Sequence, residues 1–281
     1  MNQRSNVVSA PYSAISEVRQ VAPQRFTATV RESWYMGRGA FGGLVAGLFA
    51  RALRSALSID ADPGQLRTLT CHLCEPVPAG ACSIVVELLR VGKYVSHASA
   101  RLQPPENGAR TLAAATATFT RRRPGETLRF DRAKMPEHLP LGSTPQVLNS
   151  GREPVFTRNF VYHFAGGQAP FSAGDVASFV GWTRYGGPAG PLDDALAAAY
   201  LDAWPPAVFA MSDSPRPAAT MAITYHFVRA LPDTETEAGA SYLVTASALE
   251  AVDGYSAQDN ELWSPDGRLL ARAHQVFALI K

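Results

Sequence analysis

The sequence predicts an α+β protein made of two fused copies of one unit, each a helix packed on a mostly antiparallel sheet. Two observations support this prediction. A helix followed by four strands is expected once in each half of the chain, and short residue matches link the halves at offsets of 154 to 161 residues. The length of 281 residues suits two units of roughly 130–140 residues, each able to bury a core.

The first half follows this order. Residues 1–22 are polar and without periodicity, so we expect a flexible N-terminal tail. In the first unit, 23–121, residues 26–34 alternate β-branched or aromatic side chains with polar ones, which predicts a strand. Residues 44–57 are rich in Leu and Ala and predict a largely buried helix, which an Asp-Ala-Asp-Pro-Gly segment ends. Four more strands are expected at 66–74, 82–89, 93–102 and 112–120.

The second half repeats this order of helix and strands. It begins after residues 122–153, whose content of Pro, Arg, Gly and Ser predicts a linker. The second unit, 154–281, begins with two expected strands at 155–164 and 177–184. Residues 192–203 predict a helix, because Pro191 precedes them, acidic residues occupy the first turn and two prolines follow. Four strands are again expected, at 219–228, 241–249, 254–263 and 268–280.

Residue matches support the repeat in the second part of each half. Thr-Cys-His-Leu at 70–73 corresponds to Thr-Tyr-His-Phe at 224–227, and Gly-Lys-Tyr at 92–94 corresponds to Asp-Gly-Tyr at 253–255. Leu112 and Phe119 correspond to Leu270 and Phe277. Three matches in the same order indicate two copies of one unit.

Composition limits the class of protein. A hydrophobic content of 46% excludes a disordered chain. The 26 basic and 24 acidic residues create no field that attracts a polyanion, so nucleic acid is not expected as a partner. No apolar run approaches the ~18–20 residues that span a bilayer, and the N-terminus lacks a signal-peptide core. Because three cysteines are too few for a disulfide framework, we expect a cytoplasmic protein.

A glycine pattern precedes the first helix. Gly37, Gly39 and Gly42 match the G-x-G-x-x-G sequence of dinucleotide-binding proteins. That fold alternates strands with helices, whereas here four strands follow without a helix between them, so the pattern does not favour a nucleotide. The glycines allow the helix to start close against the sheet, or its first N–H groups bind an acyl oxygen or a phosphate.

The sequence offers no metal site. Cys71 and Cys74 form a Cys-x-x-Cys pair, but residues three apart on a strand point to opposite faces, and no second ligand pair is nearby. The six histidines show no metal-binding spacing. We therefore expect neither a metal nor a cofactor.

Asp202 breaks two local rules of the second helix. It shares a helix face with the small apolar residues Ala195 and Ala199. It also stands in the last helical turn, where the helix dipole disfavours a negative charge. Such conflicts are common at functional sites; the alternative is a carboxylate that turns out to solvent.

Two further polar residues distinguish the second half from the first. Gln275 lies in a strand that we expect to be buried, and the repeat places Ala117 at its position. Thr220 corresponds in the same way to Leu66. A polar residue at a position that is apolar in the other copy suggests a site in the second half, although a glutamine that faces the surface is the alternative for Gln275.

Six short motifs carry a resemblance to a known family. They are Phe-Gly-Gly at 41–43, His-Leu-Cys-Glu-Pro at 72–76, Gly-Lys-Tyr at 92–94, Tyr-Leu-Asp-Ala-Trp-Pro-Pro at 200–206, Ala-Thr-Met at 219–221 and Ala-His-Gln at 273–275. With them the chain resembles the acyl-CoA thioesterase II type of the thioesterase-like superfamily, from about Phe26 to the C-terminus without the linker. The resemblance implies a double hotdog fold, in which curved antiparallel sheet wraps each helix and the two fused copies form a pseudo-dimer.

The resemblance also implies an activity, the hydrolysis of acyl-CoA to free acid and CoA. In the family an Asp, a Thr and a Gln position a water molecule on the thioester, and these roles fall on Asp202, Thr220 and Gln275. Ala222 stands where some relatives carry an acid, so Thr224 is the alternative source of the hydroxyl. The implied partners are the acyl-CoA substrate and further copies of the chain in a homo-oligomer.

This chemistry is consistent with the residues. A carboxylate on an apolar helix face has a raised pKa and can act as the base, while Thr220 and Gln275 can hold the water. Backbone N–H groups of Phe41, Gly42 and Gly43, at the start of the first helix, can bind the oxyanion and form the substrate-binding site.

Two other functions are compatible with the sequence. One is a hotdog hydratase or dehydratase of enoyl or hydroxyacyl thioesters, which usually pairs a His with an acid; no His is close to Asp202 in the sequence. The other is an acyl-binding protein without turnover. Free CoA released from acyl-CoA distinguishes the thioesterase from both.

Overall fold

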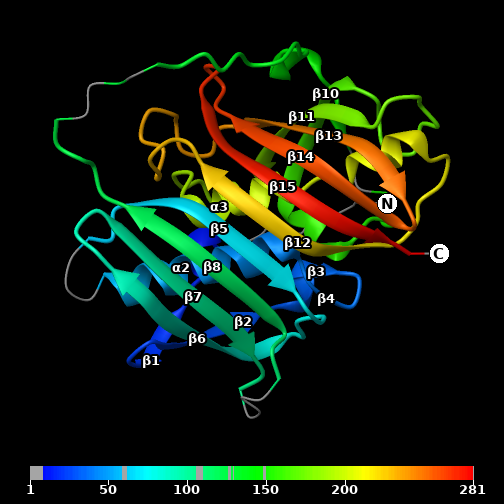
Figure 1. Cartoon of the computed structure of the whole chain (residues 1–281). Coiled ribbons are helices and arrows are strands. Elements are labelled where there is room, and N and C mark those ends of the chain that lie inside the picture. Colours follow the sequence, from blue (N-terminus) through cyan, green and yellow to red (C-terminus); the bar gives the residue numbers. More distant parts are fainter. Residues whose placement is uncertain are drawn as a thin grey trace.

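The computed structural model describes residues 9–58, 62–105, 110–125, 128, 130–147 and 150–280. Within them, thirteen strands form one antiparallel sheet, in the order β1-β2-β6-β7-β8-β5-β12-β15-β14-β13-β11-β10-β9. The helices α2 (Gly42–Leu57) and α3 (Asp194–Leu201) lie behind the sheet in the view of Figure 1. This arrangement confirms the predicted α+β fold of two helix-on-sheet units.

The strands of the sheet divide between the two halves of the chain. Those of the first half are β1 (Arg19–Ala22), β2 (Arg25–Val30), β5 (Gln65–Leu73), β6 (Gly80–Val91), β7 (Val95–Gln103) and β8 (Ala113–Thr120). Those of the second are β9 (Gln146–Val147), β10 (Phe160–Gly167), β11 (Ser178–Tyr185), β12 (Ala218–Phe227), β13 (Tyr242–Val252), β14 (Tyr255–Trp263) and β15 (Leu269–Leu279). The halves join where β5 pairs with β12, with Thr70 opposite Thr224. The matching Thr-x-His-x segments of the repeat are therefore neighbours at the centre of the sheet. A separate hairpin, β3 (Tyr35–Met36) and β4 (Gly39–Ala40), precedes α2.

The expectation of a flexible tail is wrong for residues 12–22. These residues form the short helix α1 (Tyr12–Ile15) and the edge strand β1. Two apolar side chains anchor the segment, since Tyr12 and Ile15 are buried and the Tyr12 ring packs edge-on against Trp34 and Tyr185. Apolar and polar residues alternate irregularly in this segment, so it lacks the periodicity from which burial is predicted. Residues 1–8 lie outside the described part of the chain.

Several elements begin or end at other residues than expected. Strand β2 ends at Val30, and the 3-10 helix η1 (Glu32–Trp34) occupies the rest of the predicted strand. Residues after Pro154 form the 3-10 helix η3 (Val155–Asn159) before β10 begins. In the expected linker, η2 (Leu141–Ser143) and β9 are formed, and β9 pairs with β10. After α3, the two prolines lead into η4 (Ala207–Met211).

Close contact between the two helices positions the candidate site. A Cβ atom on Gly43 would lie 2.8 Å from the Ala199 Cα, and one on Gly47 would lie 3.2 Å from the Ala195 Cβ. Because contacts made later along α2 are made earlier along α3, the helices run antiparallel. The end of α3 therefore meets the start of α2, and exchanging the two halves exchanges the two contacts.

Candidate functional site

Asp202 follows the last residue of α3, and its carboxylate lies at the start of α2. It is the C-cap residue of α3, with φ −111° and ψ 2°. A Cβ atom on Gly42 would stand 2.8 Å from its Oδ2 atom. The dipole of α3 disfavours a charge at this end, but the dipole of α2 favours one at its N-terminus. The conflict seen in the sequence is thus offset by the second helix.

Gln275 connects Asp202 with Thr220. Its Nε2 atom donates to Oδ1 of Asp202 at 2.5 Å and to Oγ1 of Thr220 at 2.8 Å. The Gln275 side chain is buried, with 1% of the residue exposed. The structure therefore brings together the three residues that the sequence suggested, one at the C-cap of α3 and the others on β12 and β15, and the glutamine does not face the surface.

A β-bulge brings Thr220 to the same side of the sheet as Gln275. Thr220 pairs with Phe277, whereas Ala222, two residues further on, pairs with Val276, so one residue of β12 is left over. Strict alternation from the buried Ile223 would turn Met221 inward, yet Met221 is 37% exposed. The bulge moves Thr220 into that position.

Thr224 does not belong to this cluster. Its hydroxyl is 3.1 Å from that of Thr70 on the neighbouring strand β5. It follows the buried Ile223 directly and so points to the opposite face of the sheet. The structure brings Thr220, and not Thr224, to Gln275.

Burial raises the pKa of the Asp202 carboxyl to about 7, although hydrogen bonds from Gln275 and from the Gly43 N–H lower it in part. The residue nevertheless keeps part of its surface accessible, as a base that must meet a water requires. Its titratable neighbours are Cys71, Tyr162 and Tyr225, whose pKa values are raised by burial and by the charge of Asp202. These three side chains are neutral near pH 7, so Asp202 is the member of this group that titrates there.

The start of α2 differs from the expectation in one respect. The N–H of Phe41 donates to the Trp34 carbonyl at 2.8 Å, and its ring stacks on Phe156 with centroids 4.1 Å apart. The expectation that its N–H binds an oxyanion is therefore wrong, because the Trp34 carbonyl of η1 already accepts from that group. Gly42 and Gly43 remain next to the carboxylate.

Two buried residues of β14 extend the site and were missed in the sequence. Asn260 Nδ2 donates to Gln275 Oε1 at 3.3 Å, and Gln258 Nε2 donates to Asn260 Oδ1 at 2.9 Å. A signal was present: Ser256, Gln258 and Asn260 are polar at alternate positions that lead to the buried Leu262. Three polar residues in a row on the inward face of a strand indicate an internal network.

The position related to this site by exchange of the halves carries no such residues. Asp202 maps on Ala50, Thr220 on Leu66, Gln275 on Ala117 and Gly42 on Asp194. A cavity of about 310 Å³ lies there, bordered by Ala50, Arg51, Arg54 and Asp194 among others. Arg54 forms an ion pair with the buried Asp194. The two halves are therefore similar in fold but unequal in chemistry.

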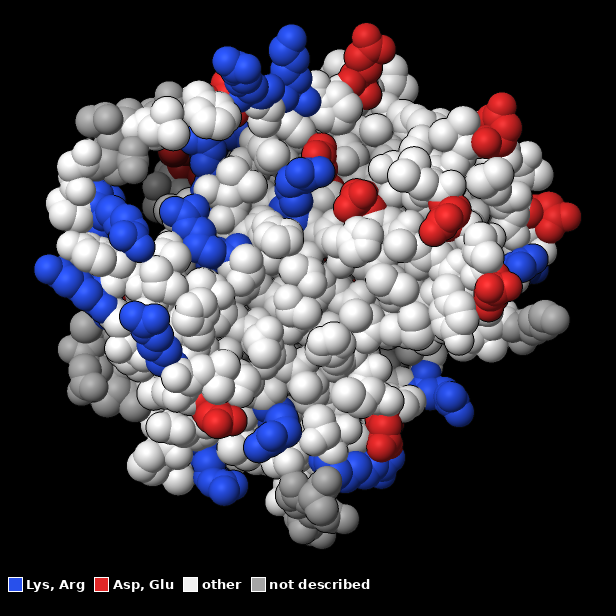
Figure 2. Space-filling model, in the orientation of Figure 1, with Lys and Arg blue, Asp and Glu red and all other residues white. Residues whose placement is uncertain are grey.

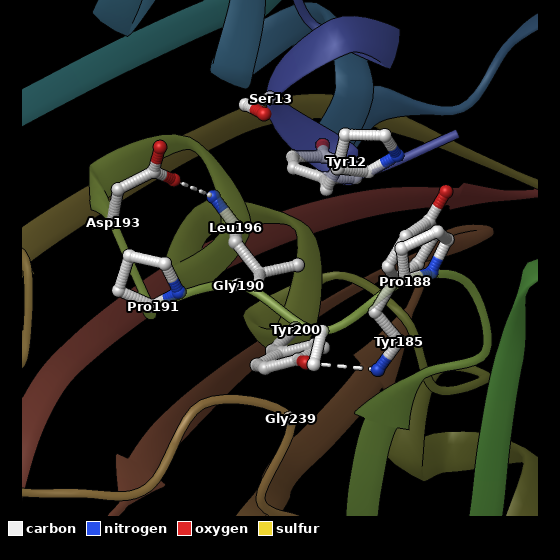
Figure 3. A pocket seen from close by; sticks show the side chains of 12 residues that line it. Tyr12, Ser13, Tyr185, Pro188, Gly190, Pro191, Asp193, Leu196, Tyr200 and Gly239 are labelled. Carbon is white, nitrogen blue, oxygen red and sulfur yellow. Dashed lines mark hydrogen bonds between the residues drawn. The ribbon is translucent and has the colours of Figure 1, made fainter.

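A smaller cavity of about 80 Å³ lies between α1, β11 and the start of α3 (Figure 3). Tyr12, Tyr185 and Tyr200 contribute to its wall, and the Tyr185 N–H donates to the Tyr200 hydroxyl at 2.8 Å. Asp193, the N-cap of α3, lines this cavity, whereas Asp202 follows the other end of that helix. This cavity is therefore separate from the candidate site.

The remaining sequence motifs have structural roles. Gly37 adopts a positive φ of 66° in the β3–β4 turn, and a Cβ on Gly39 would lie within 2.9 Å of Pro76. Cys71 is buried and Cys74 is exposed, and both are free thiols. Within the described residues, no group of three or more His, Cys, Asp and Glu side chains is arranged to hold a metal ion.

Charged side chains of both signs surround the outer face of the sheet. In Figure 2 they lie mainly toward the periphery, while the middle of this face carries few. Lys and Arg gather mainly along the left side of this view, and Asp and Glu mainly at its upper right. No helix in the described part of the chain has the length and apolar character needed to span a membrane.

Comparisons with known proteins agree with the fold. The family model of the acyl-CoA thioesterase N-terminal domain matches residues 18–120, and that of the C-terminal domain matches residues 131–279. No protein of curated function matches the sequence.

Solved structures with a hotdog fold are similar over nearly the whole chain. A conserved protein of unknown function from Alicyclobacillus acidocaldarius is 25% identical, with a TM-score of 0.85 over 98% of this chain and 99% of its own. A putative thioesterase II from Thermobifida fusca is 20% identical, with a TM-score of 0.79 over 98% and 99%. An acyl-CoA thioesterase II from Mycobacterium marinum is 16% identical, with a TM-score of 0.68 over 96% and 98%.

Proposed function

The chain belongs to the acyl-CoA thioesterase family, and from this premise we propose that it hydrolyses acyl-CoA thioesters to the free acid and CoA. One observation carries the proposal. Gln275 joins a partly accessible carboxylate, whose pKa is raised to about 7, to the hydroxyl of Thr220. A base that titrates near neutral pH suits the removal of a proton from water.

In the proposed reaction, Asp202 accepts a proton from a water molecule as the water oxygen attacks the thioester carbonyl carbon. Because Gln275 donates to Oγ1 of Thr220, the hydroxyl hydrogen of Thr220 stays free to donate to the water oxygen. Thr220 thus holds the nucleophile beside the base.

The attack places a negative charge on the carbonyl oxygen. The start of α2 supplies backbone N–H groups and the positive end of a helix dipole. We assign the Gly42 N–H to this oxyanion, since the Phe41 N–H is bound to Trp34 and the Gly43 N–H to Asp202. When the tetrahedral intermediate collapses, the C–S bond breaks and the protonated Asp202 returns its proton to the CoA thiolate.

A panel of acyl-CoAs of short, medium and long chain tests the function. We expect the wild-type protein to release free thiol from at least one of them, measured with a thiol reagent. An enoyl-CoA that is hydrated without release of thiol would replace the proposal with a hydratase. Acyl-CoA that binds at equilibrium and is recovered intact would replace it with an acyl-binding protein.

A further inference from the structure

The amide of Gln275 must adopt one of two orientations to serve Asp202 and Thr220. Its Nε2 end donates to both side chains. A rotation of the amide by about 180° would instead turn the Oε1 acceptor toward a carboxylate, where acceptor faces acceptor. The position of Thr220 and the charge of Asp202 therefore depend on what holds the other end of this amide.

Asn260 holds that end. Its Nδ2 group donates to Gln275 Oε1 at 3.3 Å and to the Leu201 carbonyl at 3.1 Å. The carbonyl of Leu201 can only accept, so Asn260 must direct its NH₂ group toward this side. Asn260 thereby offers Gln275 a donor, which the Oε1 end of the amide accepts.

Gln258 fixes Asn260 from the opposite direction. Its Oε1 atom accepts from the Ala207 N–H at 2.8 Å, and its Nε2 atom donates to Asn260 Oδ1 at 2.9 Å. The N–H of Ala207 can only donate. The direction of all three amides is thus set by two backbone groups, one at each end of the network.

The amides of Gln258, Asn260 and Gln275 are buried, so their hydrogen bonds to one another, and not water, set how the Gln275 amide is oriented. Gln258 is 4% exposed, and Asn260 and Gln275 are each 1% exposed. Water has little access to replace a lost partner, and an unpaired polar group in such surroundings is costly. The two backbone groups at the ends of the network, the Leu201 carbonyl and the Ala207 N–H, also lie on either side of Asp202 in the sequence: Leu201 directly precedes it, and Ala207 begins η4 after it.

We propose that Asn260 and Gln258 are positioning residues of the thioesterase site, which act by holding the Gln275 amide with its NH₂ group toward Asp202 and Thr220. The catalytic part of this proposal rests on the proposed function. The positioning part concerns only the charge and geometry of Asp202. Neither residue touches the reacting atoms in the proposed reaction.

A pH-dependent measurement reports on the network. The hydrogen bond from Gln275 lowers the pKa of Asp202, so loss of the correct amide orientation raises that pKa. The other titratable groups near the carboxylate are Cys71 on β5, Tyr162 on β10 and Tyr225 on β12, all with pKa values raised by burial. They stay neutral through the range in which Asp202 titrates.

The first test compares Asn260→Leu and Asn260→Asp with the wild type. Asn260→Leu lacks the donor to Gln275 at every pH, and Asn260→Asp lacks it when the new carboxyl is ionised. The second variant keeps the size of the side chain and the bond from Gln258. We expect kcat to fall about 10- to 100-fold with little change in KM. In Asn260→Leu the acid limb of the kcat/KM profile moves to higher pH. Should Asn260→Leu not fold, Asn260→Asp carries the test of kcat.

Asn159→Leu is the matched control. Asn159 is also a buried asparagine, 5% exposed, and donates to a backbone carbonyl, that of Ser33, at 2.8 Å. Its loss removes a comparable buried hydrogen bond without touching Gln275. We expect the kcat and the pH profile of folded Asn159→Leu to equal those of the folded wild type.

The second test needs no turnover. A titration of ¹³C-labelled aspartate carboxyls by NMR measures the pKa of Asp202 directly, with the missing signal of Asp202→Asn as its assignment. We expect a higher pKa in Asn260→Leu than in the wild type and Asn159→Leu. An active wild type with unchanged kcat and pKa in the Asn260 variants overturns the positioning role alone. A wild type without thioesterase activity overturns the proposed function, while the NMR result still decides the positioning.

Discussion

The carboxylate of Asp202, at the end of α3, packs directly against Gly42, the first residue of α2. A Cβ atom at position 42 would stand 2.8 Å from Asp202 Oδ2 and 3.1 Å from a methyl carbon of Leu73. The contact joins two chain segments from different copies of the repeat, and it places the carboxylate in the favourable field of the α2 dipole.

Replacement of Gly42 by Ala should displace the Asp202 carboxylate. Alanine is a better helix former than glycine, so we expect the helix itself to remain stable. The new methyl group takes space beside Oδ2, and a base displaced by about 1 Å costs up to about 10²-fold in rate. Measurement of kcat/KM for the most active acyl-CoA checks this. Gly190→Ala is the control, because a Cβ there meets nothing within 4 Å, and equal activities of the two variants would contradict the prediction.

The activity should follow the ionisation of Asp202. The carboxylate is the base, and its pKa is raised to about 7. The value of kcat/KM should therefore rise with pH through about 7 and level off above it. Steady-state kinetics between pH 5 and about 9 check the profile, and a rate already constant at pH 5 would exclude a base with this pKa.

Stability should show the opposite dependence on pH. Folding raises the pKa of the Asp202 carboxyl from its ordinary value of 3.8 to about 7. The folded state therefore holds the proton of this carboxyl more tightly than the unfolded chain does. The free energy of unfolding should fall as the pH rises from about 4 to about 7 and then stay level. Asn cannot ionise, so the free energy of unfolding of Asp202→Asn should exceed that of the wild type by on the order of 4 kcal/mol at pH 8 and by little at pH 4. Urea denaturation at the two pH values measures the difference.

One chain should contain one catalytic centre. Ala50, Leu66 and Ala117 occupy the positions related to Asp202, Thr220 and Gln275 by exchange of the halves, and none of them can act as a base or hold a water. A thioether analogue of the best acyl-CoA substrate should bind with a stoichiometry of one per chain, measured by calorimetry. Two equivalent sites per chain would contradict the inequality of the halves.

The ion pair at the related position should serve stability and not catalysis. Arg54 pairs with Asp194, whose side chain is 9% exposed and whose pKa is raised chiefly by burial. Removal of the arginine in Arg54→Leu leaves this carboxyl without its partner and should cost about 3 kcal/mol of unfolding free energy. Arg110→Leu breaks an exposed pair with Glu75, which solvent screens, and should cost much less than Arg54→Leu. Urea denaturation compares the two, and both variants should keep the wild-type kcat.

Much of the fold could be predicted because the two halves repeat one order of elements. The sequence predicts the helix at 44–57 and most strands to within a few residues of their observed bounds, since period-2 and helical patterns reflect which face is buried. The anchoring of α1 was not predictable in this way. It depends on Tyr12, which contacts Trp34 and Tyr185 from distant segments.

The site was predictable where a residue conflicted with its surroundings. Asp202 opposed its own helix dipole, and Gln275 replaced the alanine of the other copy. Thr220 could not be distinguished from Thr224 without the bulge in β12. The prediction that the Phe41 N–H binds the oxyanion is wrong because this N–H donates to the carbonyl of Trp34. No local sequence pattern reveals such a tertiary hydrogen bond.

The most direct test of the central claim is the rate of CoA release by Asp202→Asn at pH 8. Asp259→Asn is the matched control, since Asp259 is exposed on β14 and pairs with His274 outside the site. We expect Asp202→Asn to lose about 10²-fold or more in kcat, while Asp259→Asn keeps the wild-type rate. A folded Asp202→Asn protein that releases CoA as fast as the wild type would contradict the assignment of Asp202 as the base.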